Sequence, residues 1–119
     1  MSTLLVIDDD PAIHLAFRRA FQASDLRLVT VASPAEGLAC LPTGEPTAIV
    51  LDVQFPETSG LAVFRQIRER DPRVPVVFIS GVGRTETVIE AMKLGAFDYL
   101  SKPLDLAQIR NLIARAIEV

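Results

Sequence analysis

Three aspartates in this chain have the type and spacing that metal-assisted phosphoryl chemistry requires. Asp8 and Asp9 directly follow the apolar run 4–7, and Asp52 is the last residue of a second run, 47–52. A carboxylate can act as the nucleophile in phosphoryl transfer and then forms an acyl phosphate. Oxygen ligands in this number suit Mg²⁺, with Mn²⁺ as the alternative ion. The aspartates therefore predict one acidic, cation-dependent phosphoryl-acceptor site, provided that the fold brings them together.

Two further polar side chains follow apolar runs later in the chain. Ser80 comes after the run 76–79, and Lys102 comes after the run 97–101. Uninterrupted β-branched runs are typical of strands buried on both faces of a parallel sheet, whose ligands bind beyond the carboxyl ends of the strands. We therefore expect Ser80 and Lys102 beside the aspartates, where the ammonium group would neutralise charge on a phosphoryl group.

The elements that must position these residues are five strands alternating with five helices. The strands are expected at 4–7, 26–31, 47–52, 76–79 and 97–101. Helix starts are marked by Asp10 before Pro11, which makes Asp10 a cap and not a further ligand, and by Ser33 three residues before Glu36.

Three other features complete the expected helices. Pro42, Gly44 and Pro46 punctuate the end of the second helix, the third spans residues 60–71, and Gly95 can end the fourth. The last helix is expected to start at Asp105.

Strands that alternate with helices favour a doubly wound α/β fold. We expect the flavodoxin-like arrangement, a parallel five-stranded sheet of order 2-1-3-4-5 flanked by five helices. Its topological switch lies between strands one and three. This order places Asp8 and Asp9 beside Asp52.

Length, composition and charge limit the classes of protein to which the chain can belong. The 119 residues suit one domain, 1–119, and half of them are hydrophobic. A single cysteine, Cys40, excludes an internal disulfide and suits a reducing cytoplasm. No signal peptide or membrane span is apparent, so we expect a soluble, cytoplasmic protein. A net charge of -3 with dispersed basic residues gives no footprint for direct nucleic acid binding.

Taken together and in this order, the residues resemble a bacterial response-regulator receiver domain from Leu4 to the end of the chain. The matching residues are Asp8 and Asp9, Asp52 with Phe55, Pro56 and Gly60, Ser80 with Gly81, and the segment Tyr99–Pro103. The segment 95–103 looks most like receivers of the NtrC and FixJ kinds, which precede transcription activators. Phe55 departs from the more frequent methionine, and Glu57 and Thr58 from the usual loop, which leaves the rate of phosphoryl loss undetermined.

The resemblance implies a phosphoacceptor module of a two-component system and not an enzyme. Asp52 would accept a phosphoryl group from a phosphohistidine of a sensor histidine kinase. Mg²⁺ would be held by Asp9, Asp52 and the Gln54 main-chain carbonyl, with Asp8 acting largely through water. The Lys102–Pro103 peptide would be cis.

A switch is expected to couple the site to partners. The glycine-rich loop 80–84 would move so that the Ser80 hydroxyl and the Gly81 amide reach the phosphoryl group, and Tyr99 resembles the family's aromatic switch residue. The face formed by the fourth helix, fifth strand and fifth helix would then engage an output domain, a downstream regulator or a second copy in an activation-dependent homodimer.

Two alternatives from other classes stay open at this stage. A small phosphatase would form an aspartyl phosphate on Asp52 but usually has a second carboxylate two residues on, where this chain has Gln54. A degenerate receiver would act only in docking, although all five expected functional side chains are present. The single histidine, His14, is interpreted as a solvated surface residue that a partner can contact, and Cys40 as a small packed residue.

Overall fold

The computed structural model describes residues 2–81 and 83–118. Within these ranges five strands alternate with five helices, as expected. The elements are β1 (Thr3–Ile7), α1 (Pro11–Ala20), β2 (Arg27–Val31), α2 (Pro34–Gly44), β3 (Ala48–Asp52), α3 (Gly60–Arg70), β4 (Val76–Ser80), α4 (Thr85–Lys93), β5 (Asp98–Ser101) and α5 (Leu106–Glu118).

The five strands form one parallel sheet in the order β2-β1-β3-β4-β5. This order confirms the predicted flavodoxin-like topology, with its switch between β1 and β3. Every residue of β1, β3 and β4 is buried, whereas the edge strands β2 and β5 are partly exposed. The apolar runs thus correspond to central strands covered on both faces, as a parallel sheet requires.

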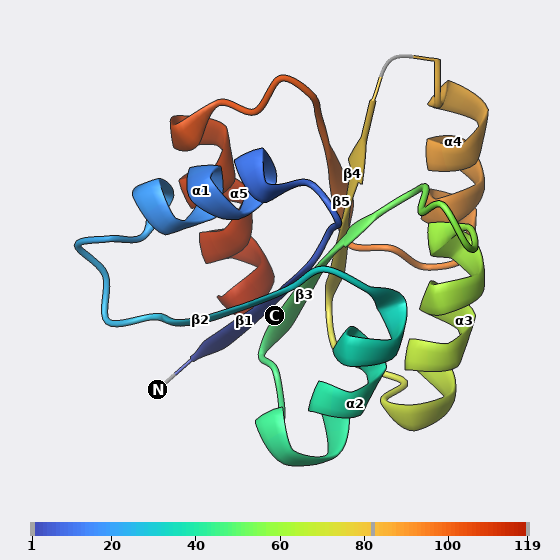
Figure 1. Ribbon diagram of the computed structural model, residues 1–119, viewed down its shortest axis with the longest axis horizontal. Coiled ribbons are helices and arrows are strands. Elements are labelled where there is room, and N and C mark those ends of the chain that lie inside the picture. The colour runs from blue at the N-terminus through green and yellow to red at the C-terminus, as the bar shows by residue number, and fades with distance from the viewer. Residues whose placement is uncertain (1, 82, 119) are drawn as a thin grey trace.

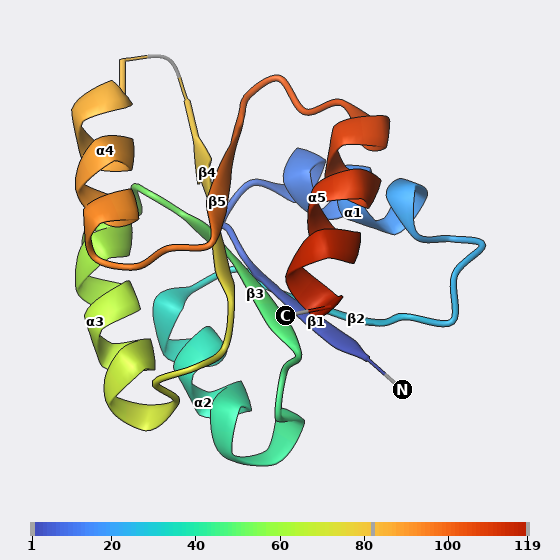
Figure 2. The same ribbon diagram turned by 180° about the vertical axis from the view of Figure 1, so that it is seen from behind.

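Two helical layers cover the sheet. Helices α1 and α5 pack on one face, and α2, α3 and α4 on the other (Figures 1 and 2). Successive strand side chains point to opposite faces, so Leu4 and Val6 enter the α1/α5 core while Leu5 and Ile7 enter the opposite one. Alternation along β1 therefore divides one apolar run between two cores.

The predicted helix caps are present. Asp10 Oδ1 accepts from the Ala12 amide at 2.9 Å, which confirms Asp10 as a cap. Ser33 and Glu36 form the expected capping pair, and Asp105 Oδ1 accepts from the Ala107 amide at 2.8 Å. Each of these side chains satisfies an amide that has no partner within its helix.

Helix ends differ in detail from the sequence expectation. Pro42 lies inside α2, where the only hydrogen bond it removes is the one that an amide at this position would donate to the Leu38 carbonyl. Glu45, which follows the helix, takes the left-handed conformation at φ 40°. Helix α3 ends at Arg70, with Asp71 as its cap. Gly95, at φ 102°, follows α4 as predicted. None of these shifts moves a strand end. Among the helices described, none has both the length and the apolar character that crossing a membrane demands.

Candidate functional site

The parallel register places the acidic residues side by side. Ile7 pairs with Leu51 across β1 and β3, so Asp8 and Asp52 each lie one residue beyond a paired position. Asp9 follows in the loop between β1 and α1. One carboxylate oxygen from each of Asp8, Asp9 and Asp52 lies within 4.8 Å of the other two. The structure thus brings together the three residues that the sequence singled out.

The cluster combines two buried carboxylates with one exposed carboxylate. Asp8 is fully buried and Asp52 nearly so, while Asp9 is exposed. Asp8 Oδ2 is buried and has no hydrogen-bond partner among the described residues. Buried polar atoms almost always have partners, so an orphaned anionic oxygen that faces two other carboxylates fits a bound cation. The donor set of hard oxygens suits Mg²⁺.

Lys102 supplies the nearest positive charge. Its Nζ lies 3.7 Å from Asp52 Oδ2 and 3.9 Å from Asp8 Oδ2, and its side chain is 30% exposed. Both distances are too long for hydrogen bonds and describe ion pairs. The Lys102–Pro103 peptide is cis, as predicted. Lys102 thus pairs with two of the three clustered carboxylates, so the acidic groups of the cluster outnumber its ammonium group.

Burial and crowding change the acidity of the two buried aspartates. Desolvation raises the pKa of Asp8 from 3.8 to about 6; the Asp10 amide and Lys102 oppose this rise, whereas Asp52 and Asp9 add to it. The Asp52 pKa is also raised, chiefly by desolvation, against the opposing effects of the Gln54 amide and Lys102. Without a cation, the folded protein therefore disfavours the fully ionised cluster.

The loop after β3 orients Asp52. The Gln54 amide donates to Asp52 Oδ1 at 3.2 Å, and the Gln54 side chain donates to the Phe55 carbonyl at 2.9 Å. Gly60 begins α3 so close to β3 that an added Cβ would collide with the Asp52 carbonyl oxygen. The loop thus returns tightly over the strand end, which explains the glycine at this position. The role of the Gln54 carbonyl as a metal ligand stays a prediction.

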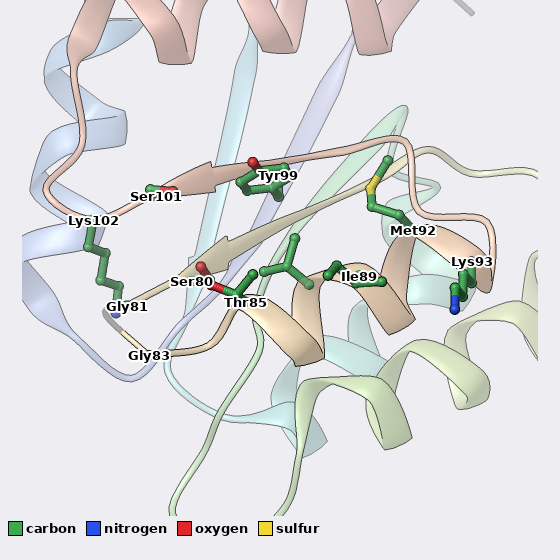
Figure 3. A pocket seen from close by; sticks show the side chains of 11 residues that line it. Ser80, Gly81, Gly83, Thr85, Ile89, Met92, Lys93, Tyr99, Ser101 and Lys102 are labelled. Atoms are coloured by element: carbon green, nitrogen blue, oxygen red, sulfur yellow. The ribbon is translucent and has the colours of Figure 1, made fainter.

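Ser80, Tyr99 and Lys102 line one cleft between α4 and β5. The cleft has a volume of about 660 Å³, and its lining includes Ser80, Gly81 and Lys102 at one end and Met92 at the other. Figure 3 shows Lys102 extending from the end of β5 toward Gly81, with Ser80 and Tyr99 facing the same space. Ser80 is buried, whereas Tyr99 is 44% exposed. The cleft therefore connects the charged site with an exposed aromatic ring.

The apolar side of this cleft comes from α4. Ile89 is 50% exposed and Met92 38% exposed, although both belong to the apolar set of that helix. Val88 and Ala91 alone are buried on α4 among the residues described. The remainder of the predicted loop 80–84 includes Val82, which lies outside the described residues. The switching roles of Ser80, Gly81 and Tyr99 stay predictions.

His14 differs from its predicted role as a solvated surface residue. It is half-buried, and its Nε2 lies 2.7 Å from the main-chain oxygen of Asp8. Side chains in a helix lean toward its N-terminus, so a residue in the first turn of α1 reaches back to the preceding loop. This lean is the signal that the sequence offered, because His14 lies in the first turn of the helix that follows the acidic pair. Cys40, by contrast, packs partly buried against the core as expected.

Comparison with known proteins gives a consistent result. The family model described as "Response regulator receiver domain" matches residues 4–114. The DNA-binding transcriptional regulator NtrC of Escherichia coli (strain K12) is 35% identical over 112 residues, which are 94% of this chain but 24% of that protein. The acid tolerance regulatory protein ActR of Rhizobium meliloti (strain 1021) is 37% identical over 107 residues, covering 90% of this chain and 55% of that protein.

Solved structures show the same similarity in three dimensions. The receiver domain of NtrX from Brucella abortus superposes with a TM-score of 0.91 at 29% identity, covering 98% of both chains. This chain thus spans about a quarter of NtrC but nearly all of an isolated receiver structure.

Proposed function

The chain belongs to the response regulator receiver domain family, and on this premise we propose that Asp52 is the phosphoryl acceptor of a two-component signalling system. One observation carries the proposal. The nearly buried Asp52 carboxylate shares its site with two further carboxylates, and an ammonium group lies 3.7 Å from its Oδ2. A nucleophile, a set of carboxylates that can hold a cation and a neutralising charge therefore lie together at the ends of β1, β3 and β5.

The two oxygens of Asp52 have different surroundings. Oδ1 accepts the Gln54 amide, which fixes the orientation of the carboxylate, while Oδ2 faces Lys102. In the proposed step, an Asp52 oxygen forms a bond to phosphorus as the phosphorus–nitrogen bond of a phosphohistidine breaks. The imidazole of the donor leaves with the bonding electron pair. Lys102 then lies where it can stabilise charge on the transferred oxygens.

The acidic cluster fits a divalent cation, and we assign Asp8, Asp9 and Asp52 to its binding, with the Gln54 carbonyl as a further ligand. The buried, unpartnered Asp8 Oδ2 supports this assignment. When bound, Mg²⁺ would neutralise charge on the carboxylates and on the phosphoryl oxygens. Asp8 and Asp9 would provide the ligands on the loop after β1, and Lys102, which follows β5, would provide the positive charge.

Phosphorylation is proposed to act through Ser80 and Tyr99. The Ser80 hydroxyl can donate to an oxygen on phosphorylated Asp52 only if the loop after β4 moves toward the site, with the Gly81 amide as a second donor. Tyr99, now 44% exposed, would turn inward along the cleft. Such a change is a shift between two loop states. A coupling of ~1–3 kcal/mol shifts partner binding 5–150-fold.

The proposed donor is a sensor histidine kinase in the cytoplasm. The face of α4, β5 and α5 would pass the signal to an output domain, a downstream regulator or a second copy of the chain. NtrC is named as a DNA-binding regulator and is much longer than this chain. We therefore assign DNA contact to an output domain and transcription control to the whole protein, with no direct nucleic acid binding by the receiver.

Intact mass after incubation with acetyl phosphate and Mg²⁺ tests the function. A stable gain of one phosphoryl group is expected, and it should disappear when a chelator removes the metal before the donor is added. Steady release of phosphate from phosphate esters would instead indicate a phosphatase. No gain in mass and no turnover would indicate a docking module and contradict the proposal.

A further inference from the structure

His14 makes a contact whose chemistry is unambiguous. Its Nε2 lies 2.7 Å from the Asp8 carbonyl oxygen, a distance at the short end of the range for such hydrogen bonds. A carbonyl oxygen can only accept, so Nε2 must carry the proton. The imidazole therefore donates to the peptide that joins Asp8 to Asp9. This peptide connects two of the three carboxylates in the cluster.

The same contact completes the set of bonds that hold Asp8. Its amide donates to the Val31 carbonyl at 3.2 Å, and its Oδ1 accepts from the Asp10 amide at 2.8 Å. With the His14 bond, the amide, the carbonyl and one carboxylate oxygen all have partners. Only Oδ2 is left without one, and it faces the cluster. Three hydrogen bonds thus fix Asp8 in an orientation that directs its Oδ2 toward the carboxylate cluster.

Helix α1 does not depend on the His14 side chain for its own start. Asp10 caps the helix through the Ala12 amide, and the Ile13 amide donates to the Asp10 carbonyl at 3.0 Å. Ile13 and Phe17 anchor the helix in the core. The His14 bond therefore leaves the helix as it is and acts on the loop. Asp9 is exposed, so the Asp8–Asp9 peptide fixes the backbone position from which its carboxylate reaches the cluster.

We propose that His14 is a positioning residue for the divalent cation site, because its Nε2–H group fixes the Asp8–Asp9 peptide and thereby aims both carboxylates. The proposal rests on the cation-dependent function proposed above. His14 itself contacts neither the cation nor the phosphoryl group. Groups that orient metal ligands in this way typically contribute 10–100-fold in metal affinity.

Three variants test the proposal. His14→Leu removes the donor at similar size, His14→Gln keeps an N–H donor on a flexible side chain, and Arg19→Leu places the same leucine at an exposed position of α1. The affinity for Mg²⁺, measured by calorimetric titration at one pH, should fall about tenfold in His14→Leu. It should stay within about threefold of wild type in His14→Gln and be unchanged in Arg19→Leu.

A spectroscopic measurement separates positioning from packing. The Asp9 amide shares a peptide with the Asp8 carbonyl, so loss of the bond should shift the Asp9 amide resonance in metal-free His14→Leu and less in His14→Gln. Ring nitrogen resonances of wild type should show the proton on Nε2. This last measurement needs no variant, so it stands even if His14→Leu fails to fold.

Three results would overturn the proposal: a proton on Nδ1 alone, equal Mg²⁺ affinity in wild type and His14→Leu, or equal losses in the leucine and glutamine variants. The last result would mean that imidazole packing and not hydrogen bonding matters. Failure of the underlying function looks different. In that case the wild-type protein itself would bind no Mg²⁺ and gain no phosphoryl mass from acetyl phosphate.

Discussion

Charged side chains have different partners at the two edges of the sheet that are formed by the carboxyl ends and by the amino ends of the strands. At the carboxyl edge, three carboxylates lie together, Lys102 pairs with two of them, and Asp8 Oδ2 has no hydrogen-bond partner among the described residues. At the other edge, before β4, the Arg68 guanidinium donates to the Val74 carbonyl at 2.6 Å and lies 4.8 Å from the centre of the Phe64 ring. Asp71 Oδ1 accepts the amides of Arg73 and Val74.

The difference shows where the fold gives up stability. A buried polar group without a partner costs about 1–3 kcal/mol, more when it is charged. The turn before β4 avoids this cost, because Arg68 and Asp71 serve the backbone around them. The acidic edge retains it, and the divalent cation proposed above would supply the partner that Asp8 Oδ2 lacks. The contribution of the acidic edge to stability should therefore depend on bound cation and on pH. The contribution of the turn before β4 should depend on whether the Arg68 side chain is intact.

The largest effect is expected for Asp52→Asn. The amide is similar in shape but a poor nucleophile, so phosphoryl acceptance from acetyl phosphate should be abolished. Metal-free stability should rise, because one of three crowded carboxylates is removed. Asp71→Asn is the matched control at the other edge, and it should keep full phosphoryl acceptance by intact mass. A mass gain in Asp52→Asn would mean that the acceptor is another residue.

The next effect is the dependence of metal-free stability on pH. The pKa of Asp8 is raised from 3.8 to about 6, so between these values the native state binds more protons than the unfolded state. The free energy of unfolding should therefore fall as pH rises through this window, with a contribution from Asp8 of about 3 kcal/mol at most. The raised pKa of Asp52 acts in the same direction.

Urea denaturation in the presence of a chelator measures this effect. Asp8→Asn should flatten the profile, and saturating Mg²⁺ should restore stability above about pH 6, where Asp8 is ionised. Stability that rises across the window, or a profile unchanged in Asp8→Asn, would contradict the assignment.

A smaller effect is expected from Arg68→Met at the other edge. Truncation leaves the buried Val74 carbonyl without its donor, which should cost about 1–3 kcal/mol in the free energy of unfolding. Affinity for Mg²⁺ should not change. Arg70→Met, on the exposed side of the same helix, is the control and should leave stability within about 0.5 kcal/mol. If the free energy of Mg²⁺ binding fell in Arg68→Met by as much as the free energy of unfolding, the two edges would not be independent.

The smallest effect on stability is expected for Ser80→Ala, which should change the free energy of unfolding by about 1 kcal/mol or less. The variant should still accept a phosphoryl group on Asp52, but the conformational response at Gly81 and Tyr99 should be weaker than in wild type. Resonances of Gly81 and Tyr99 report the transmission when wild type and variant are compared with and without beryllofluoride, an acyl-phosphate mimic. An equal response in both proteins would show that the hydroxyl does not carry the coupling.

Much of the fold was predictable because its signals are local. Apolar runs marked the central strands, and Asp10, Ser33 and Asp105 marked helix starts, since a cap depends only on residues within one turn. The end of α2 was less well predicted. Pro42 is tolerated in the final turn, and the left-handed position is taken by Glu45 and not by Gly44. Helix ends depend on small energy differences that packing can override.

The sequence pattern of α4 did not predict which of its apolar side chains are exposed. Ile89 and Met92 have the apolar character of core residues but line an open cleft, because α4 lies against β4 at its Val88 and Ala91 positions. The contact of His14 was missed for a related reason. Whether a polar residue on a helix is solvated depends on what lies before that helix, and here the Asp8 carbonyl lies within reach.

The sequence by itself determined the alternation of strands and helices and the residues at the strand ends, because hydrophobic periodicity acts on any chain with this pattern. The sheet order was an expectation that the structure confirmed. Only the tertiary structure decided that Asp8 keeps one buried oxygen without a partner, that Lys102 lies between two carboxylates, and that His14 donates to the acidic loop. These facts depend on distances of a few ångströms between elements far apart in the chain. Such distances follow from how the layers pack, and no local pattern records them.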